Sequence, residues 1–143
     1  MLLDRLLGLE TEYAIRYTAQ GNEPRPDHQL VHDALSAAIA TLVPSSAGQR
    51  RSHGQRFVAN GGAFYYEFVP SAPAGGVIEA STPECRGPSQ LLLYQKAQER
   101  LLLMALPLAE QSLARHGYPG ALGLLKNCRD ADGQVYGAQE NYE

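Results

Sequence analysis

Two glutamates stand two positions apart in the stretch GLETEYAIRY, residues 8–17 of the chain. Side chains alternate between the two faces of a strand, so Glu10 and Glu12 are expected on the same face. Two further acids, Glu67 and Glu79, also fall in strand-like segments. Acidic residues are depleted in strands. Several on one sheet therefore predict either a solvated face or a site where a divalent cation neutralises them.

The context of these acids favours a cation site over a solvated face for Glu10 and Glu79 taken together. Magnesium prefers oxygen ligands and usually combines one or a few protein carboxylates with phosphate oxygens. Any single glutamate on an open sheet is more simply explained as a solvated side chain. For Glu12 two roles stay open: contact with the metal or its bound water, or exposure to solvent beside the site.

The bulk composition fits one ordinary globular domain. The chain has 143 residues, 44% of them hydrophobic, with a formal net charge of −3. This charge predicts no nucleic-acid partner, and no apolar stretch reaches the length of a membrane span. The two cysteines, Cys85 and Cys128, show no metal-binding spacing, and we expect both to be free thiols in a cytoplasmic protein.

The order of apolar and turn-forming segments predicts an α+β fold with a mainly antiparallel sheet. We expect Asp27 to cap the first helix and Pro107 to kink or break the second. The expected elements are strands at 6–17, 77–82 and 120–128, a hairpin at 56–69 turning at Asn60-Gly61, helices at 27–43 and 88–117, polar loops at 18–27 and 44–55, a turn at 130–134 and the start of a strand at 135–137.

Four motifs occur in an order that resembles one enzyme family. They are GLETEYAI, NGGAFYYE, IEASTPEC and LLKNCRDADGQVYGAQENYE. This order is similar to that of the Pup ligases and depupylases (deamidases of Pup), which are glutamine-synthetase-like carboxylate–amine ligases. The resemblance covers most of the chain apart from residues 18–55, and the four motifs together are specific although each alone is weak.

The resemblance implies an enzyme that binds ATP and Mg²⁺ in a concave antiparallel sheet with helices packed on one face. A ligase of this family joins the C-terminal glutamate side chain of Pup to a lysine of a target protein, which marks that protein for the bacterial proteasome. A depupylase hydrolyses the same bond. The implied partners are a Pup-like small protein and its targets. We expect residues 1–143 to be the N-terminal part of such a catalytic domain, because the chain stops inside a patterned segment and 143 residues are too few to close the ATP-binding sheet.

The resemblance also implies roles for individual residues. Glu10, Tyr65 and Glu79 match the positions that bind magnesium. Glu67 stands where the family has its catalytic aspartate, and Thr82 matches a residue near the ATP.

Some positions depart from the family pattern. Glu67 stands in place of the family aspartate, and Ala63 stands in place of an arginine that contacts phosphates. Gln139 stands in place of a histidine, and Val77-Ile78 stands in place of a His-Pro pair. Two alternatives to the ligase or depupylase therefore stay open. One is a catalytically degenerate paralogue that binds Pup or a partner, and the other is a ligase that joins another carboxylate to a small amine. The retained metal-site residues favour the enzyme.

Overall fold

The computed structural model describes residues 6–48, 54–69, 75–126 and 138–142 and shows eight strands and two helices over these ranges. The elements in chain order are β1 (Leu6–Ala19), α1 (His28–Leu42), β2 (Ser45–Ala47), β3 (Arg56–Val58), β4 (Ala63–Glu67), β5 (Val77–Ser81), β6 (Cys85–Arg86), α2 (Pro88–Arg115), β7 (Gly120–Leu125) and β8 (Ala138–Tyr142). All strands belong to one sheet with antiparallel pairs, which confirms the expected α+β class.

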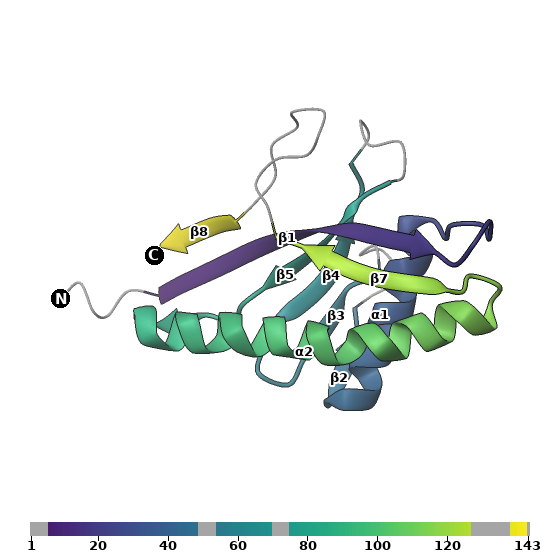
Figure 1. Ribbon diagram of the computed structural model, residues 1–143. Helices are drawn as coiled ribbons and strands as arrows, with labels where there is room; N and C mark the ends of the chain where they lie inside the picture. The colour runs from purple at the N-terminus through teal and green to yellow at the C-terminus, as the bar shows by residue number, and fades with distance from the viewer. Residues whose placement is uncertain (1–5, 49–53, 70–74, 127–137, 143) are drawn as a thin grey trace.

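The long strand β1 is the central element of the sheet. It pairs with β5 and β8 over its first half and with β7 over its second half. Glu10 is paired with Ser81 of β5 and also with Gln139 of β8, so these two strands flank β1 on opposite sides. Figure 1 shows β1 running the length of the molecule between these neighbours.

The sheet continues from β5 through the β3–β4 hairpin to β2. The hairpin turns at the expected place, because Gly61 adopts a φ of 92°, a conformation that glycine takes without strain. The Asn60 side chain closes the turn by accepting a hydrogen bond from the Gly62 amide at 2.9 Å.

Both helices pack on one face of the sheet and against each other (Figure 1). The helix α1 begins as expected at Asp27, whose carboxylate accepts a hydrogen bond from the Leu30 amide at 2.7 Å. The apolar side chains of α1 and α2 then meet the face of the sheet formed by alternate strand residues, which include Tyr13, Phe64 and Ile78. The opposite face of the sheet carries no helix among the described elements.

Three expectations about the elements need correction. The expected break at Pro107 does not occur, because Pro107 is exposed while Ala105 and Ala109 on either side are buried, and their packing keeps one continuous helix. The loop expected at 44–55 contains β2, which pairs with β3. The short strand β6 was not expected and pairs with the start of β1.

The turn at 130–134, the strand start at 135–137 and Cys128 lie outside the described residues.

Cys85 is a buried free thiol, as expected. Among the described residues, no helix combines the length and the apolar character needed to cross a membrane.

The fold predicts a large cost for removing a core aromatic ring. Phe64 is only 1% exposed, so we expect Phe64→Ala to lower the free energy of unfolding by about 3–5 kcal/mol, from lost burial and the cavity left behind. Phe57 on the adjacent strand is 39% exposed, and Phe57→Ala is the matched control, with an expected loss of about 1 kcal/mol or less. Urea unfolding followed by circular dichroism measures both, and equal losses would contradict the assigned faces.

Candidate functional site

The pairing of three strands places a row of polar side chains across the open face of the sheet. Glu12 of β1 is paired with Glu79 of β5, and Glu79 is paired with Tyr65 of β4. Directly paired residues of antiparallel strands point to the same face. Glu67 follows Tyr65 by two positions and therefore shares this face. The site is thus built by register, from strands that are distant in sequence.

Three carboxylates converge at this row. Glu12, Glu67 and Glu79 can each place one oxygen so that all three oxygens lie within 4.8 Å of one another. Glu79 is buried, Glu12 is half-buried and Glu67 is exposed. The cluster opens to solvent at Glu67, on the face of the sheet that carries neither helix. Like charges this close repel unless a proton or a cation reduces the total charge.

Tyr65 holds Glu79 in place within the cluster. Its phenol donates a hydrogen bond to Glu79 Oε1 at 2.5 Å and lies 3.1 Å from Ser81 Oγ. Burial, together with the hydrogen bond to the Glu79 carboxylate, raises the pKa of Tyr65 above its usual 10. Tyr65 therefore remains a neutral donor near neutral pH and restricts the orientation of the Glu79 carboxylate.

The surroundings of Glu79 also shift its protonation. Burial raises the pKa of Glu79, the hydrogen bond from Tyr65 opposes this change, and the carboxylates of Glu67 and Glu10 add to the rise. The resulting pKa is about 7, against an ordinary value of 4.5. Without a cation, this carboxyl group is therefore partly protonated at neutral pH.

The structure brings together only some of the residues that the sequence singled out. Glu67, Tyr65 and Glu79 lie together, and Glu10 lies two positions before Glu12 on β1, opposite Ser81. Its charge contributes to the raised pKa of Glu79, but it is not one of the three converging carboxylates.

Thr82 lies apart from this cluster. Its hydroxyl accepts a hydrogen bond from the Leu9 amide at 3.0 Å, and its own amide donates to the Leu9 carbonyl at 2.9 Å. In this position Thr82 secures the pairing of β1 with the segment after β5.

Glu12 is the residue whose role the sequence left open, and the structure places it in the cluster. The available signal was its spacing of two from Glu10, which puts both on one face. That signal did not tell which of the two glutamates faces Glu79, because this depends on the register between β1 and β5.

The donor set fits a hard divalent cation. Carboxylate oxygens are the ligands that Mg²⁺, Mn²⁺ and Ca²⁺ prefer, and these three side chains offer them from three strands of one sheet. The exposed carboxylate of Glu67 is also accessible to a reacting group and could accept a proton. The arrangement can therefore bind a cation and position a base beside it.

The raised pKa of Glu79 predicts a pH-dependent stability in metal-free buffer. The folded chain keeps a proton on Glu79 that the unfolded chain releases near pH 4.5, so stability is full below pH 4.5 and falls as the pH rises to about 7. The expected loss is at most about 3 kcal/mol, because solvent at this open face screens part of the repulsion.

Urea unfolding with EDTA between pH 4 and 8 measures this loss, and Glu79→Gln should flatten the profile. The difference between wild type and variant isolates Glu79, because His32, whose pKa burial lowers, titrates in both proteins. If the free energy of unfolding changes with pH in the same way in both proteins, the pKa of Glu79 is not raised by folding.

Comparison with known proteins supports a single family. A model described as Pup-ligase protein matches residues 5–143. The Pup–protein ligases of Jonesia denitrificans and Geodermatophilus obscurus are each 36% identical to this chain over 138 residues. These matches cover 96% of this chain and 27% of each relative, so the chain spans about a quarter of their length.

A solved structure shows the same fold. The crystal structure of the complex between prokaryotic ubiquitin-like protein Pup and its ligase PafA superposes with a TM-score of 0.71 at 27% sequence identity. The superposition covers 99% of this chain and 26% of that chain. The resemblance drawn from the four motifs is therefore confirmed, and the chain belongs to the Pup-ligase family.

Proposed function

We propose that this chain forms the cation-binding part of an ATP- and Mg²⁺-dependent ligase that attaches a Pup-like protein to lysines of target proteins. The observation that carries the proposal is the convergence of Glu12, Glu67 and Glu79 on the open face of the sheet. Phosphoryl transfer depends mainly on positioning and charge neutralisation. A rigid sheet that presents several carboxylates to one cation suits both requirements.

Glu79 and Glu12 are the proposed direct ligands of Mg²⁺, with Glu10 beside them. Glu79 is directed into the cluster by Tyr65, and Glu12 faces it across the β1–β5 pair. Glu10 is close enough to influence the pKa of Glu79. Mg²⁺ usually keeps several bound water molecules, and one of these could donate a hydrogen bond to the Glu10 carboxylate. When bound, Mg²⁺ would neutralise the phosphate oxygens of ATP and the carboxylates around it.

Tyr65 and Thr82 are proposed to support the site in different ways. The resemblance implies that Tyr65 contributes to the metal site, and its hydrogen bond to Glu79 supports a contribution through the orientation of that carboxylate. Thr82 is implied near the ATP, and its two hydrogen bonds with Leu9 support an effect through the position of β1.

Glu67 is the proposed catalytic base for the incoming lysine. It stands at the edge of the cluster, and its carboxylate is exposed where a substrate amine could approach. Removing a proton from the ammonium group of lysine makes the nitrogen nucleophilic. The longer side chain of glutamate, compared with the family aspartate, moves this oxygen outward by about one carbon–carbon bond.

Ligation is favoured over hydrolysis of the Pup linkage because the curated relatives described above are ligases. The structural neighbour is a ligase in complex with Pup, which supports a Pup-like protein as the partner of this chain. Target proteins and a cytoplasmic location follow from the family resemblance and belong to the same proposal.

Paramagnetic Mn²⁺ provides a localised test of the cation site. Substoichiometric Mn²⁺ should broaden the amide signals around Glu12, Tyr65 and Glu79 in a proton–nitrogen correlation spectrum, and Mg²⁺ in excess should reverse the effect. We expect Glu79→Gln and Glu12→Gln each to weaken binding by about tenfold or more, because each removes a charged ligand.

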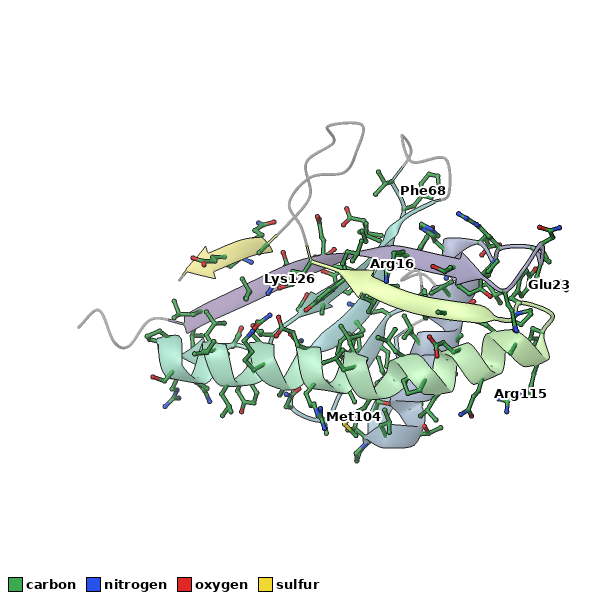
Figure 2. The ribbon with its side chains drawn as sticks, viewed as in Figure 1. Arg16, Glu23, Phe68, Met104, Arg115 and Lys126 are labelled. Atoms are coloured by element: carbon green, nitrogen blue, oxygen red, sulfur yellow. The ribbon has the colours of Figure 1, made fainter. Side chains whose placement is uncertain are left out.

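Glu23→Gln is the matched control for this experiment. Glu23 is an exposed acid in the loop after β1, at the far end of the molecule from β8 in Figure 2. Its substitution makes the same change in net charge and should leave the broadening unchanged. Broadening that is equal in all variants, or that is spread over the whole surface, would reject a specific site.

Glu67→Gln should separate catalysis from cation binding. We expect ATP-dependent attachment of a Pup-like protein to a lysine-bearing target to fall by about 10²–10⁴-fold, because the general base is lost. Mn²⁺ broadening should persist more strongly than in Glu79→Gln, since Glu67 is the exposed member of the cluster. Glu67→Asp restores a carboxylate and should recover activity. Full activity of Glu67→Gln would assign the proton transfer to another group.

A further inference from the structure

Two side chains hold the backbone of Gly76, the residue that directly precedes β5. The Gly76 amide donates a hydrogen bond to the Tyr66 hydroxyl oxygen at 2.6 Å. The Gly76 carbonyl oxygen lies 2.7 Å from Nδ1 of His28. A carbonyl oxygen can only accept, so His28 Nδ1 carries the hydrogen and donates it. Both polar backbone groups of Gly76 are therefore bound by side chains.

The two side chains reach Gly76 from different elements. Tyr66 belongs to β4 and is paired with Ile78 of β5, so its buried side chain points to the helix side of the sheet. His28 is the first residue of α1. His32, one turn further along α1, packs against the Tyr66 ring, with centroids 6.0 Å apart and planes tilted by 52°. The start of α1 and the end of β4 are thus joined at Gly76.

Glu67 lies directly beside these contacts, although its side chain faces the open side of the sheet. It is the last residue of β4 and is paired with Val77, the first residue of β5. The ends of strands open more easily than their interiors do. Gly76 approaches Glu67 so closely that a side-chain carbon at position 76 would overlap the Glu67 carbonyl oxygen. A displacement of Gly76 therefore also displaces the backbone that carries the Glu67 carboxylate.

We propose that Tyr66 and His28 are positioning residues for Glu67. By fixing Gly76 they hold the end of β4, and thereby they place the Glu67 carboxylate. This inference rests on the proposed function, in which Glu67 is the base for the incoming lysine. A general base must lie within hydrogen-bond reach of the proton that it removes, and a misplacement of about 1 Å can lower the rate by about a hundredfold. Tyr66 and His28 act through the backbone and do not touch the substrate.

The chain offers a matched control contact for each of the two residues. The Tyr17 hydroxyl donates a hydrogen bond to the Tyr118 carbonyl at 2.6 Å, and His116 Nδ1 lies 2.7 Å from the Ser112 carbonyl oxygen. Each joins a side chain to a backbone group over the same distance as the corresponding contact at Gly76, but neither involves β4 or β5. Tyr17→Phe and His116→Leu therefore remove a comparable bond without disturbing the end of β4.

Cross-strand nuclear Overhauser contacts test the positioning without a cation or a substrate. We expect Tyr66→Phe to weaken the backbone contact between Glu67 and Val77, because the end of the strand is no longer fixed. The contact between Tyr65 and Glu79, two pairs further along the same ladder, should persist. This difference separates a local opening at the end of β4 from a general loss of structure.

Hydrogen exchange at the Gly76 amide reports on the same contact. We expect this amide to exchange about tenfold faster in Tyr66→Phe, because it loses its hydrogen-bond acceptor. His28→Leu should accelerate it in the same direction, since the segment is then held on one side only. Tyr17→Phe should leave the exchange of this amide unchanged.

The kinetic consequence is measured as ATP-dependent attachment of a Pup-like protein to a lysine-bearing target. Tyr66→Phe and His28→Leu should each lower kcat by about tenfold and change the KM for ATP by less than about twofold, because the cation site stays in place. His28→Asn should recover most of the activity, since the asparagine amide nitrogen can replace Nδ1 as the donor. Tyr17→Phe and His116→Leu should keep kcat within about twofold of the wild type.

Two outcomes would overturn the positioning role. One is a contact between Glu67 and Val77 that persists unchanged in both Tyr66→Phe and His28→Leu. The other is an equal fall of kcat in these variants and in the two controls, because the loss would then follow from stability alone. A wild-type chain that attaches no Pup-like protein would instead reject the proposed function, while the Overhauser contacts would still decide whether Gly76 holds the end of β4.

Discussion

The register of the β1–β5–β4 ladder is the constraint on which the rest of the structure depends. It pairs Glu12 with Glu79 and Glu79 with Tyr65, and it leaves the alternate residues of the same strands facing the helices. A slip of one residue in any strand would exchange its two faces. Core aromatics such as Phe64 would then face solvent, and the carboxylates would enter the core. Burial of the apolar face therefore fixes the strand register, and the register in turn fixes the positions of the carboxylates.

The carboxylate cluster is held in an unfavourable charge state by this same rigidity. A flexible surface would let the three acids move apart, but strands of one sheet keep their side chains at fixed separations. The hydrogen bond from Tyr65 relieves the repulsion in part, and the raised pKa of Glu79 favours protonation of that carboxylate when no cation is bound. A divalent cation would relieve it further, which links the stability of the fold to binding at the site.

The two sides of the sheet carry opposite chemistry although the chain as a whole has a net charge of only −3. Acids gather on the open face, while the exposed side chains of α2 are mainly apolar, with Arg100 and Arg115 among them and Lys96 paired with Glu99. Gln98 of α2 connects the two sides, since its buried side chain donates a hydrogen bond to the Ser81 carbonyl of β5. The Ser81 hydroxyl in turn lies within hydrogen-bond distance of the Tyr65 phenol, so α2 is connected through Ser81 to the tyrosine that orients Glu79.

The sequence by itself determined the fold class, the main strands and helices, and the face on which the acids lie. These follow from local physics: the period-two pattern of β1, the Asn60-Gly61 turn and the Asp27 cap each depend on neighbouring residues. The order of four motifs also indicated the family, and through the family it indicated Glu67, Tyr65 and Glu79 as site residues. The short strands β2 and β6 gave no such signal, because strands of two or three residues carry too little pattern.

Only the tertiary structure decided which acids meet. Whether Glu10 or Glu12 faces Glu79 depends on the register between strands nearly 70 residues apart, and no local pattern encodes that register. The continuity of α2 through Pro107 was decided in the same way, by packing of the buried alanines around it rather than by the local preference of proline. Thr82 likewise owes its position to a distant partner, the backbone of Leu9, whose hydrogen bonds exist only in the folded sheet.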